Sequence, residues 1–156
     1  MATHGRTHYL LLVILSAMAL ANVMQGQQKC TNKTNAGRYV VICDGFMTIP
    51  NGPMVPAKAL GTAASRGDGN FVGDATVSSG GMILQQHVTG TQQLNPDCTG
   101  TISYTQWING QPAPPLDITF VISDNGDTVN GLSIDQGTVF SCVLRRMSRP
   151  LLLNEK

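Results

Sequence analysis

The sequence predicts an all-β fold, an eight-stranded antiparallel up-and-down β-barrel that follows an N-terminal signal helix. Stretches of about ten residues alternate between apolar and polar side chains, which is the period of two that strands show. Asn-Gly, Asp-Gly and Gly-Gly sequences separate these stretches, and they supply the positive φ angles that tight hairpin turns need. Glutamate, a good helix former, occurs once among the nine acidic residues, at Glu155. Helix is therefore nearly excluded from the chain that follows the signal.

The first element, residues 1–21, is expected to be a cleavable signal peptide. Arg6 gives the amino terminus a positive charge, and residues 10–21 read LLLVILSAMALA without a charge and end in Ala-Leu-Ala. These are the three parts of a secretory signal, and cleavage as late as Gly26 is a second option. The apolar stretch is shorter than the ~20 residues that cross a bilayer, so we expect no membrane segment in the mature form.

The organisation expected after the signal is a lead at residues 22–36, a barrel domain at residues 37–147 and a tail at residues 148–156. Short connections between the strands imply antiparallel neighbours in sequence order. Such strands leave two exposed edges unless the last pairs with the first, which is why we predict closure. A two-sheet β-sandwich is the alternative, because strand spacing alone does not distinguish the folds. The eight expected strands are residues 37–46, 57–66, 70–78, 82–93, 98–108, 115–124, 127–135 and 138–147.

Turn sequences bound these strands, and alternation defines their faces. In the fifth strand Ile102 and Tyr104 share one face, and in the last strand Cys142 and Leu144 do the same. In the sixth strand, the stretch from Leu116 to Ile122 places four apolar residues on one face. Glycines inside several strands suit chains that bend around a narrow barrel. The turns, in chain order, are Asn51-Gly52-Pro53, Gly67-Asp68-Gly69, Ser79-Gly80-Gly81, Asn95-Pro96-Asp97, Asn109-Gly110, Asp124-Asn125-Gly126-Asp127 and Gln136-Gly137.

Charge excludes one class of partner. Removal of 21 of the 156 residues takes Arg6 with it, so nine Lys and Arg face nine Asp and Glu. A nucleic-acid-binding domain needs a clear basic excess, so nucleic acid is not an expected partner. A basic cluster near the carboxyl end is interpreted as a solvated strand end and tail rather than an anion site. Its members are Arg145, Arg146, Arg149 and Lys156.

Four cysteines lie beyond the signal: Cys30, Cys43, Cys98 and Cys142. An even number in an exported chain indicates two disulfides, for which three pairings exist. We favour Cys30–Cys43, which would tie the lead to the first strand, with Cys98–Cys142, which would join a middle strand to the last. The spacing of the cysteines is far wider than the close ligand pairs of zinc sites. We therefore expect no metal and no cofactor.

The candidate ligand-binding residues are Tyr39, His87, Tyr104 and Trp107. His87 is the one histidine after the signal, but no acid near it in sequence would orient its ring as a general base. A solvent-facing or simply hydrogen-bonded histidine is the favoured interpretation. Aromatic rings line ligand pockets and also fill barrel cores, and a core role is favoured. Trp107 adjoins the proline-rich segment 111–115, which we expect to form a loop at the barrel mouth.

Three aspartates, Asp44, Asp74 and Asp117, lie within strands rather than turns. Two carboxylates inside a barrel can share a proton, whereas carboxylates on the polar face of a strand meet water. Asp117 alternates away from its apolar neighbours, which favours water. Two or more of these groups and His87 around an open cavity would favour an enzyme. A cavity of about 300 Å³ or more would favour a ligand, and its absence would leave a role at the surface.

Several turn motifs carry a resemblance: Gly37-Arg38-Tyr39, residues 66–73, residues 95–101, residues 120–126 and Gly137-Thr138-Val139. They resemble those of small secreted bacterial proteins of unassigned role, whose shape is similar to the calycin and allene-oxide-cyclase type of eight-stranded barrel. The likeness covers about residues 37–147 and implies a fold rather than a chemistry. Plant cyclases of this shape place polar residues around an apolar cavity, and no such set matches here, so no catalytic residue is transferred.

The expected function is that of a secreted or periplasmic, non-enzymatic β-barrel module that binds a small apolar ligand or a surface partner. The alternative is a cofactor-free isomerase or cyclase of the allene-oxide-cyclase-like barrel type. The small supply of titratable residues favours the module, because acid–base catalysis needs such groups in pairs. The sequence predicts no oligomeric state.

Overall fold

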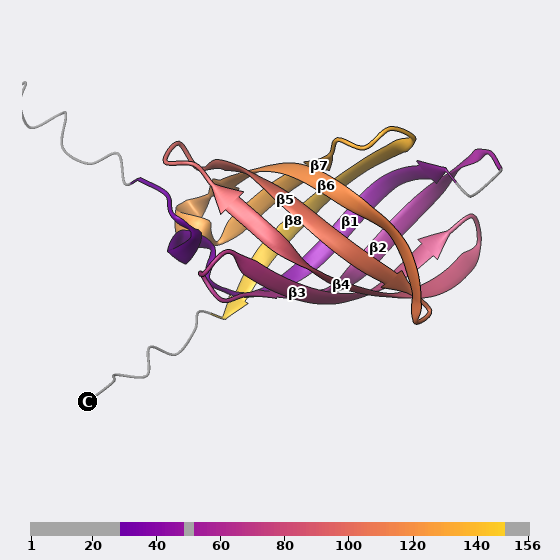
Figure 1. Ribbon diagram of the computed structural model, residues 1–156, viewed down its shortest axis with the longest axis horizontal. Coiled ribbons are helices and arrows are strands. Elements are labelled where there is room, and N and C mark those ends of the chain that lie inside the picture. The colour runs from indigo at the N-terminus through magenta and orange to yellow at the C-terminus, as the bar shows by residue number, and fades with distance from the viewer. Residues whose placement is uncertain (1–28, 49–51, 149–156) are drawn as a thin grey trace, which may run out of the picture.

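The structure, a computed structural model, describes residues 29–48 and 52–148. Its eight antiparallel strands follow one another in sequence order around a closed barrel (Figure 1). The predicted barrel is thus confirmed, and the sandwich alternative is wrong. The elements are η2 (Asn32–Asn35), β1 (Gly37–Thr48), β2 (Met54–Ser65), β3 (Asn70–Ser79), β4 (Met82–Leu94), β5 (Thr99–Ile108), β6 (Gln111–Ser123), η3 (Asp124–Gly126), β7 (Thr128–Ser133) and β8 (Thr138–Ser148).

Two expectations concern residues that the structure does not describe. The signal peptide and both cleavage sites fall in residues 1–28, and all of the tail beyond Ser148 is likewise outside the described part. Within residues 29–48 and 52–148, no helix has the length and apolar character of a membrane span.

Closure is achieved by β1 and β8, which pair from Arg38 opposite Ser148 to Met47 opposite Thr138. Pairing of the first strand with the last removes both edges that an open sheet would expose. The first and last strands of the chain are thereby hydrogen-bonded neighbours in one continuous sheet.

The proline-rich segment differs from its prediction as a loop. Residues 111–115 begin β6; residues 111–113 pair with β5, with Pro112 opposite Trp107, and Pro114 and Pro115 lie at a shift in the register. Proline is tolerated in a strand where an N–H group is not needed, as at an edge. On its other side β6 has such an edge, because β7 pairs with β6 only from Ile118 to Ser123. The physical reason for the misassignment is therefore that β7 is much shorter than β6.

Two clusters of buried side chains form the core. One contains Tyr39, Phe120, Ile122 and Val129. The other surrounds the Cys43–Cys142 disulfide and includes Ala59 and Val77. The inward-facing residues include small ones, as a narrow eight-stranded barrel requires.

All four cysteines form disulfides, but the favoured pairing is wrong: the bonds are Cys30–Cys98 and Cys43–Cys142. Cys43 and Cys142 are register partners on the closing strands, with Cα atoms 4.1 Å apart. Cys30 precedes η2 and meets Cys98 in the turn before β5. The favoured pairing tied the lead to the first strand, whereas closure of the barrel brings Cys43 to Cys142 and the lead meets the turn before β5.

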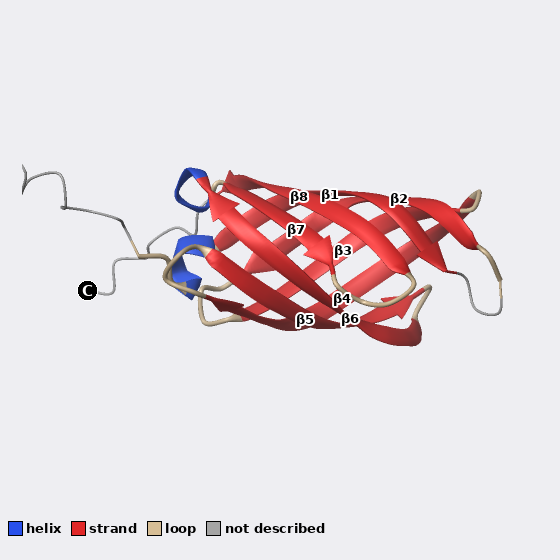
Figure 2. Ribbon diagram, turned by 90° about the horizontal axis from the view of Figure 1, so that it is seen from above, coloured by secondary structure: helices blue, strands red, loops and turns tan. Residues whose placement is uncertain are grey.

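The barrel has two different ends (Figure 2). Both short helices lie at one end, which we call the helical end, together with the Cys30–Cys98 disulfide. The opposite end, the hairpin end, carries the turns after β1, β3, β5 and β7. The helical end is where the chain covers the barrel opening.

Candidate functional site

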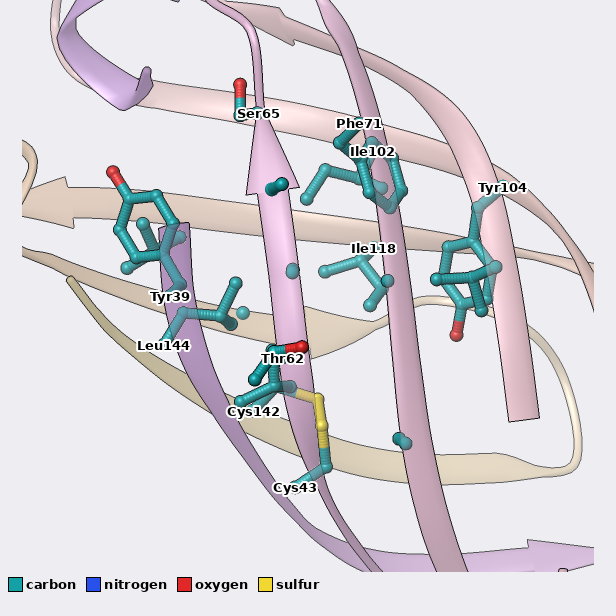
Figure 3. Close-up of a pocket in the computed structure, with 18 of the residues that line it drawn as sticks. Tyr39, Cys43, Thr62, Ser65, Phe71, Ile102, Tyr104, Ile118, Cys142 and Leu144 are labelled. Carbon is teal, nitrogen blue, oxygen red and sulfur yellow. A yellow bond between two sulfur atoms is a disulfide. The ribbon is translucent and has the colours of Figure 1, made fainter. Parts of the chain in front are cut away.

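The barrel encloses a cavity of about 110 Å³. Its wall is predominantly apolar, and Figure 3 shows side chains from several strands pointing into it. Drug-sized ligands occupy sites of ~300–1,000 Å³, so this space is well below the size that would favour a metabolite. Prominent lining residues are Tyr39, Phe71, Ile102, Tyr104, Ile118 and Leu144.

A short chain of polar side chains lies at the wall of the cavity toward the helical end. Asn35 Nδ2 donates to Gln92 Oε1 at 2.8 Å, and Gln92 Nε2 donates to Ser65 Oγ at 3.0 Å. All three residues are buried. Asn35 Oδ1 has no hydrogen-bond partner among the described residues. A buried acceptor of this kind is a position for an ordered water molecule or a small donor.

Tyr104 is the second polar feature of the cavity. Burial raises the pKa of its hydroxyl to about 12, and the negative charge of Asp135 adds to the effect. The ring packs edge-on against Phe71, with 6.2 Å between ring centroids. Gly90 lies between these two residues in the sheet, and a Cβ atom there would come within 2.3 Å of the Ser103 carbonyl oxygen. The rings of Phe71 and Tyr104 therefore pack over Gly90, where there is no room for a side chain.

The helical end is held together by Arg146, whose side chain is only 7% exposed. Its Nε donates to Asp127 Oδ1 at 2.8 Å. Its Nη2 donates to the carbonyl oxygens of Thr34 at 2.8 Å and Gly126 at 2.7 Å, and its Nη1 donates to that of Ala36. The interpretation of Arg146 as part of a solvated strand end is therefore wrong. Alternation places the side chain inside, where backbone carbonyls replace water.

Tyr39 joins the same network. Its hydroxyl donates to the Gly126 carbonyl oxygen at 2.8 Å, and the guanidinium carbon of Arg146 lies 5.0 Å from its ring centroid. A cation over an aromatic face is stabilising, and more so where both groups are desolvated. Tyr39 is 2% exposed, so the residue that was a ligand candidate takes part in the packing of the barrel end.

The four candidate ligand-binding residues separate into two pairs. Tyr39 and Tyr104 line the cavity, whereas His87 and Trp107 lie next to each other on the outside of β4 and β5, with ring centroids 5.6 Å apart. His87 Nδ1 lies 2.7 Å from Oδ1 of Asp74, its partner on β3. The sequence separation of thirteen residues hid this acid from sequence reasoning.

The in-strand carboxylates also point outward. The Asp74 side chain is 74% exposed and that of Asp44 is 64% exposed beside Lys58. Asp117 is exposed and accepts a 2.6 Å hydrogen bond from Ser103 Oγ. The groups that could form an acid–base pair thus face solvent rather than the cavity. Among the described residues there is no cluster of three or more metal-ligating side chains.

A larger hollow lies on the outside of the barrel. This outer groove, of about 610 Å³, runs over β2 to β6. Hydroxyl side chains of neighbouring strands line it: Thr89 pairs with Thr105, and Thr91 pairs with Ser103. Arg66 is the charged side chain in its lining. The remaining lining residues are Ala64, Asn70, Phe71, Val72, Gly90, Tyr104 and Pro115.

Comparisons with family models, with curated proteins and with solved structures find no match to this chain. The closed barrel is a shape that unrelated proteins share, and a fold does not carry a function with it. The resemblance to calycin-like barrels therefore remains a prediction, and the function has to be inferred from the sites themselves.

Proposed function

We propose that this chain is the precursor of a secreted, non-enzymatic binding module that meets its partner at the outer groove. The contrast between the two hollows carries the proposal. The interior cavity has about 110 Å³, whereas the outer groove has about 610 Å³. Only the groove reaches the ~300 Å³ and more of typical binding sites.

Secretion is supported by two features of the chain. The charged start and the uninterrupted apolar stretch have the pattern of a signal peptide. The two disulfides are typical of proteins that fold outside the reducing cytosol. We expect the mature protein to begin at Asn22.

The arrangement of titratable groups favours binding over catalysis. General acid–base chemistry needs a positioned pair of groups within reach of the substrate. Here the His87–Asp74 pair lies on the outer wall and Asp44 is paired with Lys58 in solvent. The cofactor-free isomerase or cyclase would work in the barrel interior, where the described residues provide no such pair.

The lining of the outer groove favours a neutral partner that carries many hydroxyl groups, such as an extracellular polysaccharide. Serine and threonine hydroxyls both donate and accept hydrogen bonds, as sugar hydroxyls do. The Oγ1 atoms of Thr89 and Thr105 lie 3.3 Å apart. Thr91 and Ser103 form the next outward-facing pair along the same two strands. Val72, which is 37% exposed, and Pro115 offer apolar contacts for the C–H faces of a sugar.

Native mass spectrometry of the mildly purified, secreted protein tests whether the interior is used. The expected mass is that of the chain from Asn22, less four hydrogen atoms for two disulfides, with nothing bound. A co-purifying small apolar molecule would contradict the proposal and assign the function to the cavity.

Binding to an array of neutral oligosaccharides tests the groove. We expect binding by the wild-type protein and its loss in Thr91→Lys, which places a long charged side chain among the hydroxyls. Gln85→Lys is the matched control, because Gln85 is equally an exposed residue of β4 but is not among the residues that line the groove. Equal binding by both variants would rule out the groove.

A further inference from the structure

A second surface of the barrel is apolar. Among residues 29–48 and 52–148, thirteen large apolar side chains are exposed, and nine of them belong to the four adjacent strands β2, β1, β8 and β7 or to the residue after β7. Soluble monomers rarely expose contiguous apolar patches beyond a few hundred Å². These nine residues, which we call the β1 face, are Ile42, Phe46, Met54, Leu60, Leu132, Ile134, Val139, Val143 and Met147.

The centre of the β1 face is contiguous because sheet pairing places its residues side by side. Ile42 is the partner of Leu60 on one side and of Val143 on the other. Phe46 is the partner of Val139. Their exposed fractions are 53% for Ile42, 62% for Leu60, 38% for Val143, 48% for Phe46 and 55% for Val139.

One row of charges crosses this face between the two apolar rows. Asp44 lies midway between Ile42 and Phe46 on β1, and Lys58 is its partner on β2. The Lys58 Nζ and Asp44 Oδ1 atoms are 2.9 Å apart, and the side chains are 77% and 64% exposed. The row therefore presents one positive and one negative charge next to each other at the centre of an apolar patch.

We infer that the β1 face binds the same face of a second copy of this chain about a two-fold axis. An isologous interface requires a self-complementary surface. A two-fold axis through the charged row brings Asp44 of each copy toward Lys58 of the other, while the apolar rows meet on both sides. A like-charged patch would not satisfy this condition.

The size of the β1 face agrees with such an interface. The four strands lie ~4.8 Å apart; three are eleven or twelve residues long and β7 has six. The face is therefore roughly 14 Å wide and up to ~36 Å long, before side-chain relief is added. Relief brings the accessible area to the order of the ~800 Å² that each partner buries in a standard interface. β1 and β5 are four strands apart in a ring of eight, and Figure 2 shows β8, β1 and β2 on the side away from β4, β5 and β6. A dimer therefore leaves free the part of each outer groove that lies on β3 to β6.

Sedimentation of the oxidised, secreted protein tests the inference. We expect a dimer in the wild type and about a hundredfold larger dissociation constant for Leu60→Glu, because the variant places a charge in an apolar row of the interface and adds a negative charge beside the Asp44–Lys58 row. Ile83→Glu is the matched control: Ile83 is 64% exposed on β4, and its variant should dimerise like the wild type. A wild-type chain that stays monomeric up to about 100 μM, well above a micromolar dissociation constant, overturns the inference.

A charge-exchange experiment distinguishes pairing between copies from an effect on folding. Asp44→Lys gives a face with two positive charges and Lys58→Asp gives one with two negative charges, so each variant alone should be monomeric. A mixture of the two should form heterodimers, because each positive pair then meets a negative pair. If the mixture stays monomeric, or if the monomers bind lipid vesicles instead, the β1 face is not a dimer interface.

Discussion

The two ends of the barrel are closed by different chemistry. At the helical end, the guanidinium of Arg146 donates to three backbone carbonyls and to Asp127. At the hairpin end the closing groups are neutral: Gln86 Nε2 donates to Gln106 Oε1 at 2.6 Å, and Gln106 Nε2 donates to the Pro114 carbonyl oxygen at 2.8 Å.

This difference has an energetic meaning. Hydrogen bonds to charged groups contribute about 1.5–3 kcal/mol, against about 0.5–1.5 kcal/mol for neutral ones. The helical end is also cross-linked by Cys30–Cys98. We therefore expect the hairpin end to open first. The loss in the free energy of unfolding when the residues of each end are replaced should show which end limits stability.

Replacement of Arg146 should have the largest effect. Arg146→Met keeps the apolar stem but removes the donor to the Thr34 and Ala36 carbonyls, one of the two donors to the Gly126 carbonyl, and the ion pair with Asp127. We therefore expect a loss of about 3–5 kcal/mol in the free energy of unfolding. Urea denaturation measures it. Arg145→Met, on the exposed outer side of the same strand, should stay within about 0.5 kcal/mol of the wild type. Similar losses in both variants would mean that the buried network does not close this end.

High pH should weaken the barrel through Tyr104, whose hydroxyl points away from Ser65 and the helical end in Figure 3. Its pKa is raised to about 12, against about 10 in the unfolded chain. The folded state therefore holds its proton more tightly, and the associated stability is complete below pH 10 and is lost as the pH rises to 12. By linkage the loss is about 2–3 kcal/mol. Tyr104→Phe should remove this part of the pH dependence, and an unchanged alkaline profile would contradict the assignment.

Loss of Gln106 should destabilise the hairpin end by about 2 kcal/mol. Gln106→Leu removes two hydrogen bonds and leaves Gln86 and the Pro114 carbonyl without them. Amide hydrogen exchange should rise in the β5–β6 hairpin and stay unchanged around η2. Gln85→Leu is the control, because Gln85 is exposed on the outer face. Faster exchange at both ends would show that the ends open as one unit.

The smallest effect is expected for Tyr39→Phe, at about 1 kcal/mol. The Gly126 carbonyl loses the tyrosine hydroxyl but keeps the guanidinium of Arg146 as a donor. A double variant with Arg146→Met should then lose more than the two single losses added together, since the carbonyl is left without either donor. Strict additivity in a double-mutant cycle would show that the two donors act independently.

The sequence was sufficient to predict the strands, but not the disulfides and side-chain pairs that link one strand to another. Alternation and turn residues located all eight strands, since both signals are local. The disulfide partners were misassigned because Cys43 and Cys142 meet only through closure of the ring, ninety-nine residues apart. The Asp74–His87 pair was missed for the same reason, as it depends on the register of β3 against β4.

The candidate site was less predictable than the fold. Tyr39 and Tyr104 were named for their rings, and the cavity does contain both. Their aromatic character does not separate them from Trp107. Alternation along β5 does, because Trp107 lies three positions after Tyr104 and therefore on the outer face. Arg146 appeared to be one charge of a basic tail, because its role depends on carbonyls supplied by η2 and η3.

The start of β6 bears on how this protein avoids polymerisation. Residues 111–116 extend beyond the reach of β7, and three of them, Pro112, Pro114 and Pro115, have no N–H group. An unpaired strand margin ordinarily recruits further strands and seeds fibrils. Here the stretch can offer few N–H donors to an incoming chain, so the exposed margin of the β5–β6 hairpin resists the addition of further strands.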